Sequence, residues 1–512
     1  MAGNSCRLRT PSAVGAPISI HALSLYNSLQ TASGIAGPCV SPCFYTPFPR
    51  CRDWRRPTAR RCFRRPPSST RCLPTLTHRQ RWPVTANRWR HWPGTDTPSA
   101  WRKASMTRDA RRRRVAVLGA GITGCCIALF LARKGIPVSL FDMRRAPMEG
   151  ASRWNEGKIH LGYLYGADSS LATARHVLPG GLAFRPLMQE LLEQDLSGQV
   201  TGNDDVFLIH RDSVVGADQA RAYYLSVDEL LKHSDDASDY LCDLRGRSTQ
   251  QLSSAELAAI ADPAWVSAGF RVPERSVHTH WFADQLCAAV AAQAGIEQRM
   301  DERVDTVRRH DGTTGRWQVV TAENSETFDC VVNALWHGRL AIDSAAGLAP
   351  PAEWSARYRL ALFVRTGKPL DTPSAVLGVG PFGDIKNYNG RDFYLSWYPA
   401  GLVHESDAPS PVGEETLALA LDHDAVEKAT GENLSAILSG VGEILASSVE
   451  TRVGGGWVVA QGRGPLSSPG STLHRRDRFG VSRLGTYYSV DTGKYSTAPW
   501  LAHALAGEIA AG

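Results

Sequence analysis

Apolar residues are concentrated in short runs separated by glycine in the stretch from residue 114 to residue 142. Val115–Leu118 form an apolar run of strand length, and three glycines occupy the next six positions. Cys125–Lys134 then carry apolar residues at helical spacing, and Gly135 ends this predicted helix. Val138–Phe141 form a second, mostly apolar run. The pattern predicts a strand, a tight turn, a helix and a second strand, as in a parallel α/β unit.

Helical and strand patterns return along the rest of the chain. Apolar residues at helical spacing predict helices at 182–196, 218–232, 280–294, 424–448 and 500–511. Short apolar or alternating runs predict strands at 206–210, 296–299, 305–309, 317–321, 328–334, 454–460 and 487–490. The run at 328–334 is almost wholly apolar, as expected of a buried parallel strand.

The segment from residue 353 to residue 405 has a different character. Tyr358–Arg365 and Phe393–Tyr398 read as strands, and Asn389-Gly390 between them is a hairpin-turn dipeptide. This pattern predicts an antiparallel sheet in a second domain. At 512 residues the chain is long enough for two domains.

The first glycine turn has the GxGxxG spacing that binds the pyrophosphate of a dinucleotide. The first N–H groups of the following helix, and its dipole, attract phosphate. Asp142 lies 18 residues after the last glycine, where a carboxylate binds an adenosine ribose. We predict dinucleotide binding here, and the alternative is a glycine-rich turn in an ordinary α/β unit. The predicted contacts are Gly119 for the turn, Gly121 for the phosphate approach, Gly124 for helix–strand packing, and Ile122, Thr123, Asp142 and Met143 around them.

A second GxGxxG spacing occurs within the predicted antiparallel segment, at Gly378, Gly380 and Gly383. The residues that follow it contain Asp, Asn and Gly and cannot continue a helix. We therefore predict no second nucleotide site.

Charge is distributed unevenly. Residues 1–107 hold sixteen Arg and one Lys against two Asp, whereas the remainder has 40 basic and 48 acidic residues. The basic segment has no sustained period and is rich in Pro and Ser, so we predict that it is disordered. It reads as an organelle transit peptide, as a basic arm for nucleic acid or a membrane surface, or as sequence upstream of the native start. We favour the third interpretation, because Met106 and a basic stretch directly precede the first strand.

Cysteine does not indicate a disulfide framework or a metal site. Six of the eleven cysteines lie in the first 107 residues, and Cys39 and Cys43 have no second Cys/His pair at zinc spacing. The others are scattered, which is typical of reduced thiols. No apolar run qualifies as a transmembrane segment, and we expect a cytoplasmic protein unless the first segment targets an organelle.

The stretch from Gly150 to Tyr165 is rich in Gly, Asn, His and Tyr and has no helix or strand period. Such a loop suits the wrapping of a large rigid ligand. Arg144 and Arg145 after the second strand leave an alternative open, in which they bind the 2′-phosphate of NADP. The charged turn from His474 to Arg478 reads as a solvated loop rather than a site.

These motifs together resemble the D-amino-acid oxidase/glycine oxidase superfamily of FAD-dependent oxidoreductases. The residues that carry the resemblance are the opening GxGxxG unit, Asn155, Gly157, Ile159, His160 and Gly162 with nearby tyrosines, and Ser169–Ala172. The NxGxIHxG run is most similar to the L-2-hydroxyglutarate and glycerol-3-phosphate dehydrogenase branch. The resemblance implies an α/β fold with a Rossmann-like FAD-binding domain and an inserted antiparallel substrate domain.

The resemblance also implies where FAD binds. Asn155, Gly157 and His160 would pass the flavin ring, and the loop containing Gly493 and Lys494, before a Pro-started helix, would embrace it. Lys494 either supplies positive charge to the reduced flavin or is a surface lysine. Covalent attachment of the flavin is a minor alternative. The implied domains are FAD-binding at 108–205, 276–345 and 481–512, and substrate-binding at 206–275 and 346–480.

For function we expect removal of a hydride from a C–H bond beside an amine or hydroxyl of a small amino acid or 2-hydroxy acid. His160 is the candidate base for a hydroxyl substrate, whereas an amine needs no strong base. Arg365 and Tyr394, with Arg391 and Tyr398 as further candidates, would bind a carboxylate. The electron acceptor would be oxygen, a quinone or a carrier protein, and no nucleic acid is expected. The alternatives are an NAD(P)-dependent dehydrogenase, a flavin monooxygenase, and a non-enzymatic protein acting through the basic segment.

Overall fold

The computed structural model describes residues 113–310 and 315–512. The predictions for residues 1–107, including the disordered segment, its alternative roles and the Cys39/Cys43 pair, lie outside the described residues. Within the described residues no helix is long and apolar enough to cross a membrane. Their five cysteines form no disulfide.

A mainly parallel sheet of six strands begins with the predicted glycine-turn unit. Its strand order is β19-β20-β12-β1-β2-β8, and only β19 runs antiparallel to its neighbour. This order brings strands from the first and last parts of the described chain together, because β12 and β20 add to one side of β1. The strands are β1 (Val115–Leu118), β2 (Val138–Phe141), β8 (Ile296–Arg299), β12 (Cys330–Asn333), β19 (Gly480–Leu484) and β20 (Tyr487–Asp491).

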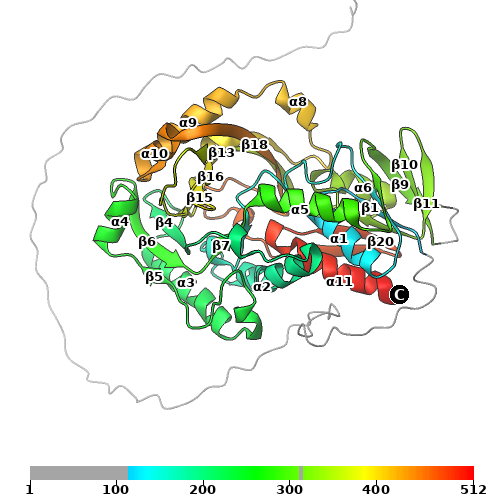
Figure 1. Cartoon of the computed structure of the whole chain (residues 1–512), viewed down its shortest axis with the longest axis horizontal. Coiled ribbons are helices and arrows are strands. Elements are labelled where there is room, and N and C mark those ends of the chain that lie inside the picture. Colours follow the sequence, from blue (N-terminus) through cyan, green and yellow to red (C-terminus); the bar gives the residue numbers. More distant parts are fainter. Residues whose placement is uncertain (1–112, 311–314) are drawn as a thin grey trace, which may run out of the picture. The chain divides into compact units, whose positions relative to one another are not determined.

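Helices pack around this sheet. The helix α1 is buried along nearly its whole length and contacts α5 and α11, and α11 also contacts α2 (Figure 1). A three-stranded antiparallel sheet, β11-β10-β9, adjoins α6 through β9. The elements are α1 (Ile122–Arg133), α2 (Ala172–Leu192), α5 (Thr279–Ala292), β9 (Val304–Arg309), β10 (Trp317–Thr321), β11 (Ser325–Phe328), α6 (Arg339–Ala346) and α11 (Ala498–Ala511).

A second large sheet has nine strands. Its path is β17-β13-β16-β15-β14-β4-β6-β5, with β18 paired to β13, and all pairs except β14–β4 are antiparallel. The strands are β4 (Asp205–His210), β5 (Gln250–Gln251), β6 (Val266–Val272), β13 (Ser355–Thr366), β14 (Ala375–Gly378), β15 (Gly383–Asn387), β16 (Asp392–Trp397), β17 (Leu402–Ser406) and β18 (Ser448–Ala460).

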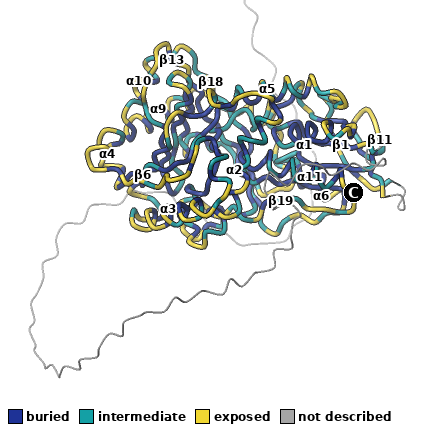
Figure 2. Tube along the Cα trace, turned by 60° about the horizontal axis from the view of Figure 1, so that its bottom comes forward, coloured by how far each residue is buried: buried dark blue, intermediate teal, exposed yellow. Residues whose placement is uncertain are grey.

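The remaining elements connect or cover these sheets. Most positions of α1 and of the central strands of both large sheets are buried, whereas α3 and α4 carry many exposed residues (Figure 2). The elements are β3 (Lys158–Ile159), which pairs with β7 (Arg275–Ser276), then α3 (Ala217–Lys232), α4 (Ser254–Ile260), α7 (Tyr398–Gly401), α8 (Glu414–Ala418), α9 (His423–Ile437) and α10 (Val441–Ala446).

The structure corrects several predicted elements. The helix expected at 182–196 spans Ala172–Leu192 instead, because Gly180 and Gly181 let this part of the helix pack closely against Thr497 and the His160 carbonyl. The turn at Asn389-Gly390 joins β15 to β16 rather than following β13. The helix expected at 424–448 is two helices, and β18 begins at Ser448. The second GxGxxG, by contrast, leads from β14 into β15 and not into a helix, as the sequence predicted.

The predicted α/β fold with an antiparallel second sheet is confirmed. The roles and bounds of the two expected domains remain predictions.

Candidate active site

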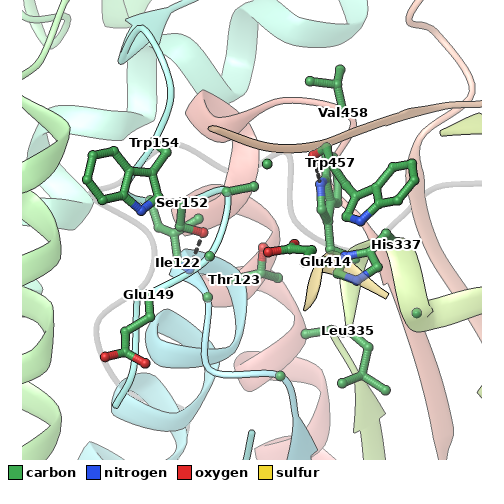
Figure 3. A pocket seen from close by; sticks show the side chains of 18 of the residues that line it. Ile122, Thr123, Glu149, Ser152, Trp154, Leu335, His337, Glu414, Trp457 and Val458 are labelled. Carbon is green, nitrogen blue, oxygen red and sulfur yellow. Dashed lines mark hydrogen bonds between the residues drawn. The ribbon is translucent and has the colours of Figure 1, made fainter. Parts of the chain in front are cut away.

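A cavity of about 520 Å³ lies where the carboxyl ends of β1, β2 and β12 face the nine-stranded sheet. Its walls include the glycine turn, the loop at 148–160, parts of β13 and β18, and the loop before α11. Crevices at the carboxyl ends of parallel strands are the usual ligand sites of such sheets. In Figure 3, Trp457 and His337 line the wall opposite Ser152 and Trp154.

The glycine turn forms one end of the cavity. Gly119 has a φ of +94°, and a Cβ there would lie 2.7 Å from the Ala334 carbonyl oxygen. A Cβ on Gly124 would collide with the Gly119 carbonyl, so this glycine packs the helix on the strand and does not line the cavity. The Ile122 N–H donates to Ser152 Oγ at 3.0 Å (Figure 3). Gly121, Ile122 and Thr123 at the start of α1 line the cavity, and binding of a phosphate there remains a prediction.

Asp142 ties the end of β2 to the glycine turn. Its carboxylate accepts hydrogen bonds from the Ala120 N–H at 2.7 Å and the Arg144 N–H at 2.9 Å. Burial raises the pKa of Asp142, and these two hydrogen bonds oppose the rise. Asp142 and Met143 both line the cavity, where the structure places them within reach of a ligand.

The loop at 150–162 is held rigidly beside the cavity. The Asn155 amide donates to the carbonyls of Ala151 and Ser152, both at 3.0 Å, and its oxygen accepts from the Gly157 N–H at 2.9 Å. Gly157 has a φ of +66°, and a Cβ there would collide with the Val277 carbonyl. Asn155 therefore lines the cavity, whereas Gly157 supports the loop from behind.

His160 lines the cavity but is almost completely buried. Its Nδ1 lies 4.0 Å from Glu274 Oε1 and has no hydrogen-bond partner among the described residues. Burial holds the pKa of His160 well below its ordinary value, and the positive charges of Lys494 and Lys158 act in the same direction. The imidazole is therefore neutral at pH 7, and it is a weak base.

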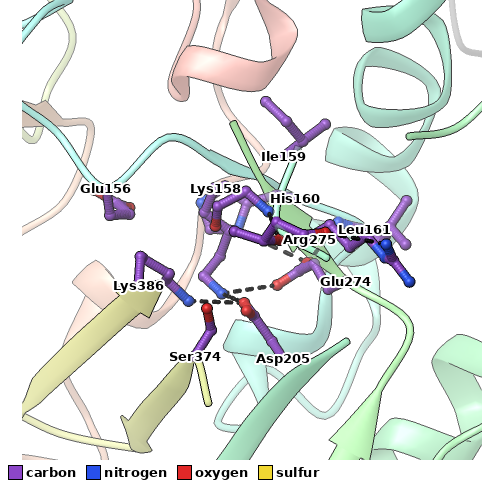
Figure 4. A network of polar contacts seen from close by, with 12 residues as sticks. Glu156, Lys158, Ile159, His160, Leu161, Asp205, Glu274, Arg275, Ser374 and Lys386 are labelled. Atoms are coloured by element: carbon purple, nitrogen blue, oxygen red, sulfur yellow. Dashed lines mark hydrogen bonds and ion pairs between the residues drawn. The ribbon is translucent and has the colours of Figure 1, made fainter. Parts of the chain in front are cut away.

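Four buried charged side chains pair with one another beside His160. We call Lys158, Asp205, Glu274 and Lys386 the paired cluster. Asp205 forms ion pairs with Lys158 and, at 2.7 Å, with Lys386, and Glu274 lies 3.5 Å from Lys158 (Figure 4). Glu274 also accepts the Leu161 N–H at 2.6 Å. Each side chain is at most 2% exposed. Such pairing is expected of buried charges, because a buried charge without a partner destabilises the fold.

The loop before α11 reaches the same cavity. The φ of Gly493 is +63°, and its N–H donates to Asp491 at 2.9 Å. Lys494 lines the cavity rather than the outer surface, with Nζ 5.7 Å from the centre of the Tyr165 ring. Burial, aided by Arg476, lowers the pKa of Lys494 to about 8. The structure thus places positive charge at this end of the cavity.

Two arginines that the sequence analysis did not assign line the cavity from the second sheet and its connection to β19. Arg359 donates to Ser396 Oγ at 2.7 Å and lies over the Tyr398 ring. The turn at 474–478 is not a fully solvated loop, because Arg476 points into the cavity. Burial lowers the pKa of Arg476 to about 10, so it remains charged. Arg359 Nε and Arg476 Nη1 are buried without a hydrogen-bond partner among the described residues.

Of the predicted carboxylate-binding residues, only Tyr394 lines the cavity. Arg365 is exposed and pairs with Asp392 at 2.7 Å, and Arg391 donates to the Gly367 carbonyl at 2.8 Å. Tyr398 accepts a hydrogen bond from Arg357 at 3.0 Å. Arg365 lies six residues after Arg359 on β13, which is about 20 Å along the strand, so it is far from the cavity that Arg359 lines. The sequence analysis did not single out Arg359 as a site residue.

A second missed feature covers the opposite end of the cavity. We call residues 410–415, on the connection between β17 and α9, the strap. Glu414 of the strap forms an ion pair with Arg144, and both line the cavity. Burial raises the pKa of Glu414, and Arg144 opposes the rise. No local sequence pattern joins these two residues, which are 270 positions apart.

A family model described as "FAD dependent oxidoreductase" matches residues 114–456. The chain belongs to this family. The resemblance inferred from the sequence is therefore confirmed, and the protein is an FAD-dependent enzyme.

Solved structures of this family share the fold. Glycine oxidase from Geobacillus kaustophilus aligns with a TM-score of 0.52 and 17% identity, over 78% of this chain and 95% of that one. L-α-glycerophosphate oxidase from Mycoplasma pneumoniae, with FAD bound, aligns with a TM-score of 0.52 and 13% identity, over 78% and 94%. The amino acid oxidase NikD aligns with a TM-score of 0.55 and 14% identity, over 78% and 94%.

A curated relative has higher sequence identity over a shorter stretch. The bifunctional protein MnmC of Ralstonia nicotianae, named for tRNA 5-methylaminomethyl-2-thiouridine biosynthesis, is 28% identical over 272 residues. The match covers 49% of this chain and 36% of MnmC. The chain thus spans about a third of the length of that relative.

The cavity of this FAD-dependent oxidoreductase fits the cofactor. The glycine turn and the loop before α11 both line it, although they are far apart in the chain. A Cβ on Gly121 would lie 2.9 Å from Ser152 Oγ, so the glycine keeps this end open. Among the described residues, no group of three or more His, Cys, Asp or Glu side chains could hold a metal ion.

Proposed function

We propose that this enzyme oxidises the C–H bond next to an amine or hydroxyl group in a small molecule that carries a carboxylate. The observation that carries the proposal is the pair of arginines at the substrate end of the cavity. Arg359 and Arg476 each have a buried guanidinium nitrogen without a partner, and Lys494 adds a third positive charge. Buried donors of this kind favour an anionic ligand, and guanidinium groups suit carboxylates.

The cofactor residues follow from the two ends of the cavity. We propose that Gly119, Gly121, Ile122 and Thr123 hold the pyrophosphate at the start of α1. Asp142 and Met143 would lie beside the adenosine, with Gly124 keeping α1 against β1. Asn155 and His160 would line the flavin, Gly157 would support that loop, and Gly493 and Lys494 would approach the flavin from the other side.

The bound flavin supplies the acceptor for the hydride that leaves the substrate carbon. The chain's own residues bind and orient the substrate. Arg359 and Arg476 would hold its carboxylate, and the buried Tyr394 hydroxyl would close the same wall. His160, being neutral and buried, would accept a hydrogen bond at Nδ1 and exclude water rather than act as a strong base.

The names of related proteins support this substrate class. Glycine oxidase and NikD are amino acid oxidases by name, and MnmC is named for a methylaminomethyl product on tRNA. The glycerophosphate oxidase is named for an alcohol. The proposed substrates therefore include both amines and alcohols.

Anaerobic bleaching of the flavin tests the proposal. The purified protein should be yellow, and amino acids, N-methyl amino acids and 2-hydroxy acids should be compared with their decarboxylated analogues. We expect bleaching only by the carboxylates. Arg476→Gln should raise the concentration needed for half-maximal bleaching by about 10- to 100-fold, the effect of one charge-assisted hydrogen bond.

The control is Arg478→Gln, because Arg478 is exposed and pairs with Glu353 at 3.2 Å. This variant should bind and react as the wild type does. Equal bleaching by the decarboxylated analogues would contradict the proposal, and so would a colourless protein that FAD cannot reconstitute.

A further inference from the structure

Glu156 places a carboxylate in the same part of the cavity as the arginines. It lies between Asn155 and Gly157, whose mutual hydrogen bond fixes the loop. The Tyr388 hydroxyl donates to the Glu156 carbonyl at 3.2 Å, so the backbone is held from a second direction. Gly157 packs against the Val277 carbonyl on the side away from the cavity, and Glu156 lines the cavity.

The carboxylate of Glu156 accepts a hydrogen bond from its own backbone N–H but has no side-chain partner. Among the described residues, no side chain forms a hydrogen bond or ion pair with it, and no dashed line reaches it in Figure 4. The other acidic side chains discussed at the cavity wall are engaged: Asp142 accepts two N–H groups, and Glu414 pairs with Arg144. A carboxylate that lines a cavity and pairs with no side chain has acceptor capacity left for a ligand that donates hydrogen bonds.

The surroundings keep Glu156 ionised. Burial alone would raise the pKa of Glu156, but the charge of Lys494, the hydrogen bond from its own backbone N–H, and the charges of Arg359 and Lys158 overcome this effect and lower it. A second carboxylate, Asp384, is close enough for its negative charge and that of Glu156 to repel each other. Asp384 is not among the residues that line the cavity. Glu156 is therefore an anion that lines the same cavity as a group of cations.

We propose that Glu156 binds the substrate nitrogen and makes the enzyme prefer an amino acid to the 2-hydroxy acid of the same carbon skeleton. This inference rests on the proposed function, in which Arg359 and Arg476 bind the carboxylate. An α-ammonium group offers three donors and a positive charge to Glu156, whereas a hydroxyl offers one donor and no charge. The ammonium group and the carboxylate of the substrate then each meet a group of opposite charge in the cavity. Binding at both groups also orients the carbon atom between them.

The same geometry disfavours alcohol oxidation. A hydroxyl substrate needs a base that takes its proton, and a strongly ionised carboxylate is a poor base. His160 is held neutral but is also a weak base. An α-ammonium group is much more acidic than a hydroxyl, so it can release one proton to solvent before the hydride leaves the carbon, and the neutral amine that remains still donates hydrogen bonds to Glu156. The cavity is thus better suited to bind an ammonium group than to deprotonate a hydroxyl.

Matched pairs of substrates test the inference. The rate of anaerobic flavin bleaching is measured against concentration for alanine with lactate, and for glutamate with 2-hydroxyglutarate, using both enantiomers of each. The wild type should prefer the amine in the pair that reacts. Glu156→Gln should reduce this preference by about 10- to 100-fold, mainly by raising the half-saturating concentration of the amine. Glu156→Asp, which keeps the charge, should recover part of it.

The visible spectrum and flavin content of each variant show whether it has folded, and Glu229→Gln on the exposed surface of α3 is the matched control. A wild type that prefers the hydroxy acid, or a preference that Glu156→Gln leaves unchanged, would overturn the inference and leave the proposed function standing. Bleaching by neither member of any pair, nor by any carboxylate of the larger panel, would contradict the proposed function itself.

Discussion

Two neighbouring groups of charged side chains in this enzyme differ in one respect, which is whether the protein supplies their partners. In the paired cluster, Asp205 joins Lys158 and Lys386, and Glu274 completes the group. In the second group, which we call the cavity cluster, Glu156, Arg359, Arg476 and Lys494 line open space, and two guanidinium nitrogens have no partner. Buried charges are stable only when they are compensated. The first group is compensated by the fold, and we infer that the second is compensated by a ligand.

The largest expected effect comes from breaking the paired cluster. Asp205→Asn leaves two buried lysines facing a neutral amide, and Glu274 contacts only one of them. Removal of one member of a buried pair costs about 3–5 kcal/mol. We therefore expect the free energy of unfolding to fall by that amount, measured by urea unfolding of the flavin-loaded protein with circular dichroism.

Asp243→Asn is the control for this change. Asp243 pairs with Arg245 at 2.7 Å, and both side chains are more than half exposed. Solvent screens an exposed pair of this kind, so its loss should leave the free energy of unfolding almost unchanged. Equal losses in the two variants would mean that the paired cluster does not stabilise the fold.

The comparison also explains what could be predicted from the sequence. The glycine turn and Asp142 lie within one local unit, so spacing alone placed them at the cavity. The ion pairs of Asp205 join residues 47 and 181 positions apart, and no local period encodes them. Arg359 and Arg365 lie on the same strand, but only the structure shows that Arg359 lines the cavity while Arg365 is exposed. Arg476 lies within a run of charged residues, His474 to Arg478, and such a run is typical of a solvated turn.

A smaller effect is expected when the charge of the cavity cluster is titrated. The pKa of Lys494 is about 8, below its ordinary value of 10.5, because burial and Arg476 disfavour the charged form. Lys494 therefore loses its positive charge as the pH rises through about 8. If it attracts the substrate carboxylate, kcat/KM should decline above that pH, by up to about tenfold per pH unit.

Lys494→Arg separates this effect from titration of the substrate, because arginine remains charged throughout. The ammonium group of the substrate titrates equally in both proteins, so the difference between the two pH profiles reports Lys494. The arginine variant should keep its kcat/KM to higher pH. Superimposable profiles would show that the charge of Lys494 does not act on the substrate.

In the apo-protein the lowered pKa of Lys494 also makes the stability of the fold depend on pH. Stability should rise with pH, whereas kcat/KM should fall. Between pH 8 and 10.5 the folded protein binds fewer protons at Lys494 than the unfolded chain does. Raising the pH across this window therefore removes a penalty and stabilises the fold. A ligand that compensates the charge should weaken this dependence, which is the behaviour expected of the cavity cluster and not of the paired cluster.

The smallest effect is expected at the ion pair between Arg144 and Glu414, which is intermediate between the two clusters. The protein supplies both partners, but the side chains are 30% and 14% exposed, and the pair holds the strap against the wall of the cavity. Glu414→Gln should remove about 1 kcal/mol of this attachment, which corresponds to roughly fivefold weaker retention of FAD. Release of flavin fluorescence on dilution measures the effect. The control is Glu443→Gln, whose exposed pair with Lys368 at 2.7 Å lies outside the cavity lining. If both variants retain FAD equally, the ion pair of the strap contributes nothing to cofactor binding. The Arg144–Glu414 pair would then not be intermediate between the paired cluster and the cavity cluster.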